Sequence, residues 1–344
     1  MKLTDFKPKS QLVTKVTLVD KPRFPVIDAH NHLGEAFGGG WDRRPVNELL
    51  DLLDEAGVTQ YVDLDGGWGE EALDAHLKHF KEGAPNRFQV FGGVDWSQWK
   101  EKGEAFPAWA AKRLVAQKER GAQGIKIWKP FGLHVKDQDD RLVDVDDARL
   151  TPIWETAGEL GLPVMVHVAD PVAFFDPLDE TNERWEEIGQ HPDWAFTSPP
   201  FPPFMHILNC FKNLVRRHPR TTFIGAHVGC YGENLGWVGG MLDDCPNYYI
   251  DISARLGELG RQPYSARRFF IQNQDRILFG SDMGPDLEAY RLCWRLLETD
   301  DEYFNYNTGE VPAQGRFYAY GLHLPDEVLK KVYRENAMKV LGIK

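Results

Sequence analysis

Short apolar runs alternate with longer amphipathic segments along almost the whole chain. Eight of these runs are rich in Val, Ile and aromatic residues, which predicts strands at residues 26–32, 60–64, 88–94, 125–128, 164–168, 222–227, 248–252 and 277–282. Segments with apolar residues at helical spacing separate them, such as VNELLDLLDEA at Val46–Ala56. Strands that alternate with helices are expected to be parallel, because each helix crosses back over the sheet.

This alternation predicts an α/β fold, and eight such units close into a (β/α)8 TIM barrel. An open doubly wound sheet is the alternative, but no G-x-G-x-x-G motif follows the first strand. We expect one domain over residues 1–344, with an N-terminal extension at 1–24 and a long loop insertion after strand 5 at 169–203. The insertion contains FFDP and SPPFPPF, which favours an ordered, lid-like segment. A docking surface between the subunits of a homodimer is the other interpretation.

The composition argues against several partners. The formal net charge is −12, from 40 Lys and Arg against 52 Asp and Glu, so nucleic acid is not an expected partner. The sequence contains no run of about 18 apolar residues, so no membrane span is expected, and residues 1–25 contain no apolar signal-peptide core. The four cysteines form no C-x-x-C pair, which is typical of reduced thiols in a cytoplasmic protein.

The first predicted strand ends in the motif VIDAHNHLG. Residues two apart in a strand share a face, so Val26, Asp28, His30 and His32 are expected to point to the same side, inside the barrel. Two imidazoles one pleat apart can bind one metal ion. Taken alone, the motif also fits two histidines that are satisfied by hydrogen bonds at a strand end.

Three other predicted strands also end in polar residues. His167 ends VMVH, His227 ends FIGAH, and Asp282 ends ILFGSD. The C-terminal ends of barrel strands form the active face, so these side chains are expected to meet there. A carboxylate opposite imidazoles suits Zn²⁺ or a similar ion, whereas the alternative for Asp282 is an N-cap of the next helix.

Basic and aromatic residues near two other strand ends are candidate substrate contacts. In GIKIWKPFG, the isoleucines suit the helix-facing side, so Lys126 and Trp128 are expected to point inward. A buried lysine needs a partner, either Asp282 or a substrate carboxylate. Lys129 at the strand mouth and Arg255 after strand seven are expected to contact a substrate anion, although either is also compatible with the surface.

The order of these motifs resembles the amidohydrolase superfamily, and most closely amidohydrolase family 2, which includes aromatic-acid decarboxylases. FIGAHVG, YYIDIS, RILFGSDMGPD and ENAMKVLG carry the resemblance along nearly the whole chain. The resemblance implies that four residues bind one divalent metal ion: His30, His32, His167 and Asp282. It also implies that His227 holds or deprotonates a metal-bound water. In binuclear relatives a carboxylated lysine on strand four bridges two ions, which would be Lys126 here if a second metal binds.

The expected function is therefore a metal-dependent hydrolase that attacks a small amide, ester or lactone with a metal-activated water. His227 would accept the proton of the water, and Asp282 would pass a proton to the leaving group. Zn²⁺ is the expected ion, with Mn, Fe or Co as alternatives. The second hypothesis is a decarboxylase, since the aromatic segment 174–194 and Arg255 suit an aromatic acid. A barrel that only binds a ligand is the third, and the complete set of metal ligands argues against it.

Overall fold

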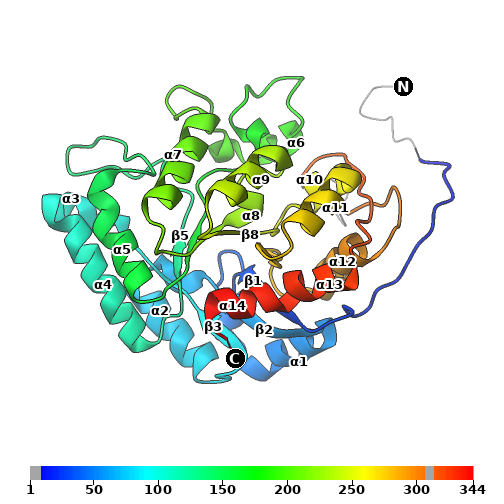
Figure 1. The fold of residues 1–344 in the computed structure, drawn as a ribbon, viewed down its shortest axis with the longest axis horizontal. Coiled ribbons are helices and arrows are strands. Elements are labelled where there is room, and N and C mark those ends of the chain that lie inside the picture. Colours follow the sequence, from blue (N-terminus) through cyan, green and yellow to red (C-terminus); the bar gives the residue numbers. More distant parts are fainter. Residues whose placement is uncertain (1–8, 307–313, 344) are drawn as a thin grey trace.

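The computed structural model describes residues 9–306 and 314–343, and parallel strands form its centre (Figure 1). Residues 1–8 of the expected N-terminal extension lie outside the described residues. The strands pair in chain order, β1 to β3 in one sheet and β4 to β9 in the other. They are β1 Val26–Asn31, β2 Val58–Asp63, β3 Phe88–Val90, β4 Gly92–Gly93, β5 Ile125–Ile127, β6 Val164–Val166, β7 Phe223–Gly225, β8 Tyr248–Asp251 and β9 Ile277–Leu278.

The two sheets meet within the predicted third strand. Phe91 alone separates β3 from β4, and its N–H still donates to the carbonyl of Asp63 on β2 at 2.9 Å. The next N–H, of Gly92, donates to Gly124 on the other side, also at 2.9 Å. The strand therefore changes its hydrogen-bonding partner at this bend but remains one strand of the barrel.

The first and last strands close the ring. The N–H of Ala29 donates to the carbonyl of Phe279, and the N–H of Asp282 donates to the carbonyl of His30, each at 2.9 Å. Counting β3 and β4 together, the described residues form eight parallel strands in a closed ring. The predicted (β/α)8 TIM barrel is thus confirmed, although β9 is shorter than the predicted run 277–282.

This seam leaves no room for a side chain at Gly280, where an added Cβ would lie 2.7 Å from the Cβ of His30. We expect Gly280→Ala to lower the free energy of unfolding by about 1–3 kcal/mol, as overpacked sites do. Chemical denaturation followed by circular dichroism measures this. Gly240→Ala is the matched control, because a Cβ there meets nothing within 4 Å, and equal stability of the two variants would contradict the prediction.

Helices form the outer layer (Figure 1). The first shows why the sequence folds this way: α1 buries Leu49 and Leu53 and ends at Gly57, whose φ of 80° suits glycine. None of the described helices is long and apolar enough to cross a membrane. The α-helices are α1 Val46–Ala56, α2 Glu70–His76, α3 Trp99–Lys102, α4 Phe106–Arg120, α5 Thr151–Glu159, α6 Trp185–Gln190, α7 Phe204–Arg217, α8 Ala226–Gly229, α9 Leu235–Asp244, α10 Leu256–Arg261, α11 Pro263–Gln272, α12 Leu287–Glu298, α13 Asp326–Lys330 and α14 Asn336–Leu341.

The barrel interior is apolar at the end where the strands begin. A buried cluster inside the ring joins side chains from most strands, and the C-terminal residues Met338, Leu341 and Ile343 pack against it. The strand residues of this cluster are Ile27, Ala29, Val62, Met165, Ile224, Tyr249 and Leu278. Polar side chains therefore have space in the interior only at the opposite end, where the strands finish.

The expectation that Val26 and Asp28 share the inner face with His30 is wrong. The pairing of β1 with β2 shifts register between Asp28 and Asn31, which breaks the alternation of faces. Asp28 instead accepts hydrogen bonds from the Tyr290 hydroxyl on α12 at 2.8 Å and from Ser281 at 2.7 Å. It is a buried structural acid between the barrel and α12.

The segment 169–203 lies between β6 and α7. It contains α6 and two short 3-10 helices, Val172–Phe174 and Pro192–Trp194. Arg184 ties it to the body of the barrel through an ion pair with Glu258 of α10, in which both side chains are almost fully buried. The segment thus contains regular structure, and some of its residues, such as Phe174 and Trp194, line a cavity at the strand ends.

Candidate active site

A cavity of about 470 Å³ opens at the C-terminal ends of the strands. It brings together every residue that the sequence nominates for the site. These residues are His30, His32, Lys126, Trp128, Lys129, His167, His227, Arg255 and Asp282. The expected inward orientation of Lys126 and Trp128 on the strand-four motif is therefore observed.

His30 and His32 are held through their Nδ1 atoms. Nδ1 of His30 lies 2.8 Å from Oδ2 of Asp251, and Nδ1 of His32 lies 2.7 Å from Oδ1 of Asp65. An ionised carboxylate only accepts hydrogen bonds, so each Nδ1 carries a hydrogen and each Nε2 is the ring nitrogen left to face the cavity. The two Nε2 atoms lie 3.9 Å and 3.1 Å from Oδ1 of Asp282. Carboxylates behind histidines orient metal ligands in this way.

The electrostatics of this cluster favour charged acids. Burial raises the pKa of Asp282, but His30 and His32 outweigh that effect and hold it well below its usual range. Burial likewise lowers the pKa of His32, yet hydrogen bonds with Asp282 and Asp65 raise it to about 9. His32 is therefore protonated at neutral pH until something displaces its proton.

His167 lies close to this cluster but makes a different set of contacts. The donor atoms of His30, His32 and Asp282 lie within 4.8 Å of one another, and His167 is not part of that group. Its Nε2 is buried and has no hydrogen-bond partner among the described residues, and Oδ1 of Asp170 is 3.4 Å away. Burial lowers the pKa of His167 to about 4, so its ring is neutral. A buried nitrogen lone pair without a partner is what a metal ligand offers before the ion binds.

His227 enters the cavity because the backbone turns sharply after β7. Both His227 and Val228 have a φ of 58°, a left-handed conformation that is strained for a β-branched residue. Nδ1 of His227 lies 3.0 Å from the carbonyl oxygen of Ser253, to which it donates. Its Nε2 therefore faces the cavity, 3.7 Å from Oδ2 of Asp282.

The structure gives Lys126 a different partner from the two expected for it. Its Nζ lies 3.0 Å from Nε2 of His30, which accepts its hydrogen bond. Burial lowers the pKa of Lys126, while Asp282 and Asp251 partly oppose the shift. The amine thus occupies the lone pair of one predicted metal ligand, and an ion on His30 must displace it.

One wall of the cavity is aromatic. The rings of Trp68 and Trp128 stack with centroids 3.9 Å apart, and Trp128 also stacks on His32 at 5.2 Å. Phe37 extends this wall at 6.1 Å from Trp68. Trp128 Nε1 is buried and has no hydrogen-bond partner among the described residues. The wall offers a flat apolar surface directly beside the histidines.

The cavity also carries charge. Lys129 pairs with Asp170 at 2.7 Å, and its ammonium lies over the Trp194 and Phe196 rings, so the cation expected to meet a substrate already has partners. Arg255 is buried and donates from Nη1 to the carbonyl of Ala254 at 2.8 Å. Among the described residues, four lysine and arginine side chains line the cavity, namely Lys126, Lys129, Arg184 and Arg255.

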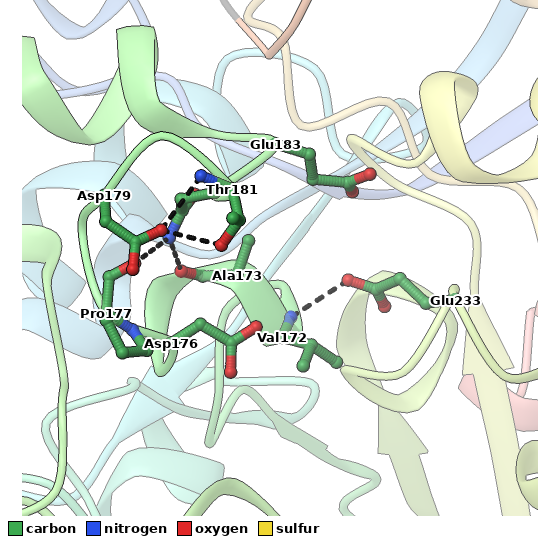
Figure 2. A pocket seen from close by; sticks show the side chains of 9 residues that line it. Val172, Ala173, Asp176, Pro177, Asp179, Thr181, Glu183 and Glu233 are labelled. Carbon is green, nitrogen blue, oxygen red and sulfur yellow. Dashed lines mark hydrogen bonds between the residues drawn. The ribbon is translucent and has the colours of Figure 1, made fainter.

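A second cavity, of about 530 Å³, has the opposite character (Figure 2). In this cavity Asp179 accepts a hydrogen bond from the N–H of Thr181, and Glu233 accepts one from the N–H of Val172 at 3.0 Å. Within the part of the chain that the structure describes, the lining of this cavity includes no lysine or arginine and four acids: Asp176, Asp179, Glu183 and Glu233. Among the described residues, it lacks the histidines and basic side chains that line the first cavity, so the histidine-lined cavity is the better candidate site.

Several residues of the site were not nominated from the sequence. Asp65 and Asp170 follow strands β2 and β6 but end no recognisable motif, Trp68 ends the short 3-10 helix Asp65–Trp68, and Phe37 lies in a turn. Asp65 and Asp170 each come within a few residues of a predicted strand end, which is the one signal that could have found them. The aromatic residues carry no such signal.

Comparisons with known proteins agree with this architecture. An uncharacterised TIM-barrel protein from Bordetella bronchiseptica is 16% identical, with a TM-score of 0.55 over 93% of this chain and 99% of the other. 5-Carboxyvanillate decarboxylase from Sphingomonas paucimobilis is 14% identical, with a TM-score of 0.55 over 93% and 100%. A dihydroxybenzoic acid decarboxylase from Polaromonas, with bound manganese and 2-nitroresorcinol, is 15% identical, with a TM-score of 0.56 over 93% and 97%.

No curated protein sequence matches the chain. The amidohydrolase family model, however, matches residues 27–343, which is nearly the whole chain. The protein therefore belongs to the amidohydrolase family, as the order of its strand-end motifs predicted.

Proposed function

We propose that this amidohydrolase-family protein is a metal-dependent decarboxylase of a small aromatic carboxylic acid. The observation that carries the proposal is the stacked Trp68–Trp128 wall, at 3.9 Å, beside the histidine and aspartate cluster. A planar substrate ring stacks on such a wall and directs its carboxylate to the cluster and the basic residues. The decarboxylases among the similar structures support the same reaction class.

One divalent ion is assigned to His30, His32, His167 and Asp282. The unsatisfied Nε2 of His167 and the orientation of the other two histidines fit such an ion. Bound there, the ion supplies a positive charge that holds a substrate oxygen and stabilises its negative charge. These donors suit Zn, Mn, Fe or Co, and the manganese in the Polaromonas structure makes Mn²⁺ and Zn²⁺ the ions to test first. A second ion on carboxylated Lys126 is not needed.

The residues of the chain account for the proton that the reaction requires. Breaking the bond between ring and carboxylate releases CO₂ and leaves an electron pair on the ring carbon, which must take up one proton. His227 can carry that proton at Nε2, since its Nδ1 is committed to Ser253. Burial and the neighbouring His167 hold the pKa of His227 well below its usual range, so a proton on this ring is readily given up to the ring carbon. Asp282, 3.7 Å away, stabilises the protonated ring electrostatically. Arg255 and Trp128 are assigned to substrate binding, and Lys129 to holding Asp170.

Hydrolysis by a metal-activated water, which the sequence favoured, is the competing reaction. The decisive assay supplies Mn²⁺- or Zn²⁺-loaded protein with carboxyl-labelled hydroxybenzoic acids, and in parallel with esters and amides of the same acids. We expect labelled CO₂ and the decarboxylated phenol in equal amounts. Cleavage of the esters or amides without any CO₂ would instead establish the hydrolase.

Removing the aromatic wall is expected to weaken substrate binding. Trp128→Ala should raise KM about tenfold, the equivalent of roughly 1.4 kcal/mol of lost stacking, with a smaller change in kcat. Trp185→Ala is the matched control, because that indole is exposed and does not line the cavity. An unchanged KM in Trp128→Ala would remove the wall from the substrate site.

Metal binding is expected to depend on pH through His32. Its pKa of about 9 means that the ion must displace one proton below that pH. The affinity for Mn²⁺ should therefore rise about tenfold per pH unit from near pH 6.5 to near pH 8.5 and level off above pH 9. Calorimetric titration measures this, and a constant affinity across that range would contradict the assigned role of His32.

A further inference from the structure

Helix α7 carries a histidine and a cysteine one turn apart. His206 and Cys210 are four residues apart in FMHILNC, and residues at this spacing lie on one face of a helix. The imidazole is half-exposed, while the thiol is almost completely buried. Neither residue lines the histidine-rich cavity. Their chemistry is therefore unexplained by the proposed decarboxylase.

A carboxylate from another part of the chain completes the group. Nε2 of His206 lies 2.8 Å from Oδ1 of Asp144, which belongs to the loop between β5 and α5. The same Nε2 lies 3.6 Å from Sγ of Cys210. The three donor atoms all lie within 4.8 Å of one another. An imidazole, a thiol and a carboxylate thus converge on one point from two separate segments.

The spacing matches tetrahedral coordination. Zinc binds sulfur at about 2.3 Å and nitrogen at about 2.0 Å, which places the two ligand atoms roughly 3.5 Å apart. The observed 3.6 Å between Sγ of Cys210 and Nε2 of His206 already has this value. Nitrogen and oxygen ligands require roughly 3.4 Å, so Asp144 must withdraw about 0.6 Å from His206. Its side chain is 53% exposed and free to make that adjustment.

The surroundings of the Cys210 thiol, which are buried and acidic, favour binding of a cation and disfavour nucleophilic chemistry. Burial, with Asp146 and Asp144 adding to it, raises the pKa of Cys210 to about 12, so the free thiol stays protonated. A bound dication reverses this balance, because a coordinated thiol loses its proton. Asp146 also hydrogen-bonds with the Cys210 thiol, but its Oδ2 accepts from Asn213 at 3.1 Å and lies 3.5 Å from Arg217, so we expect a water as the fourth ligand.

We propose that Asp144, His206 and Cys210 form a second metal site, which takes a thiophilic divalent ion such as Zn²⁺. Thiolate and imidazole ligands select Zn²⁺ and its neighbours over Mg²⁺, Ca²⁺ or Mn²⁺. The ion would join the loop after β5 to α7. That loop leaves the active cavity at Lys129 and Pro130, and α7 follows the segment 169–203, so the ion braces two segments that frame the cavity.

Titration with Co²⁺ tests the proposal independently of catalysis. A cobalt ion bound by a thiolate shows a sulfur-to-metal charge-transfer band, and none of the four residues assigned to the catalytic ion is a cysteine. We expect the band at saturation to correspond to about one thiolate-bound Co²⁺ per chain, and to disappear when Zn²⁺ is added. Asp282→Asn, which impairs only the catalytic cluster, should retain it.

Two variants and one control complete the experiment. Cys210→Ser should abolish the band, and the exposed His206→Gln, which is not expected to affect folding, should weaken Co²⁺ binding at least tenfold. Cys245→Ser is the matched control, because that thiol is also buried but lies outside the group, and it should keep the band. Absence of the band at excess Co²⁺, or its persistence in Cys210→Ser, would overturn the proposal.

Discussion

Replacing His227 with asparagine is expected to lower kcat by about 100- to 10,000-fold, the range that one general acid or base contributes, while the metal content stays unchanged. The amide of asparagine can still donate to the carbonyl of Ser253, as Nδ1 of His227 does at 3.0 Å. It lacks the titratable Nε2 that faces Asp282. Asparagine also tolerates the left-handed backbone, where φ is 58°, better than most residues.

His323→Asn is the matched control for this variant. His323 is also left-handed, with a φ of 46°, but it is exposed and does not line the cavity. Its replacement should leave kcat, metal content and stability unchanged. Steady-state kinetics with elemental analysis of each variant decides the matter. Full activity in His227→Asn would remove His227 from the proton-transfer step.

Replacing Asp282 with asparagine is expected to weaken metal binding by more than about 100-fold, the upper range for residues that only support a ligand, and to abolish turnover. The variant removes the one charged oxygen ligand, which Nε2 of His32 approaches at 3.1 Å. It also leaves protonated His32 without one of its two acids, so the pKa of His32 should fall. The backbone at Asp282, with a φ of 52°, again tolerates asparagine.

Asp140→Asn controls for the substitution itself, since Asp140 has a φ of 59° and is exposed, far in sequence from the cluster. It should bind metal as the native protein does. Dissociation constants for Mn²⁺ from calorimetry provide the comparison. If Asp282→Asn bound Mn²⁺ with native affinity, the ion would have to be placed elsewhere.

The sequence predicted the strand ends well because each barrel strand changes from apolar to polar residues where the barrel interior becomes accessible to solvent. His30, His32, His167, His227 and Asp282 all interrupt an apolar run at that point, and the cavity contains all five. The same reasoning failed for Asp28. A register shift within β1 turns it outward, and no residue in VIDAHNHLG marks that irregularity.

The partners of the histidines could not be predicted from local pattern. Asp251 orients His30 from 221 residues away, and Asp65 orients His32 from 33 residues away. Such pairs depend on the order of strands around the barrel and on side-chain rotamers, neither of which has a local signal. Trp128 was expected to point inward, but its stacking on Trp68 was missed for a related reason, because Trp68 follows β2 and meets Trp128 only once β5 is in place.

The sequence alone also did not distinguish a lyase from a hydrolase. Both reactions use the same cluster of metal ligands, so the strand-end motifs do not distinguish them. The discriminating features are the aromatic wall and the basic residues of the cavity, which come from several segments of the chain. Their combination favours a planar carboxylate, and it is visible only in the folded chain.

The central claim is that His30, His32, His167 and Asp282 bind one catalytic divalent ion. Anomalous diffraction from crystals grown with Mn²⁺, collected at the manganese absorption edge, tests it most directly. We predict one strong peak in the cavity within about 2.0–2.3 Å of these donors, with Lys126 displaced from His30. A cavity without a peak, while the Mn²⁺ lies elsewhere or is not bound, would contradict the account.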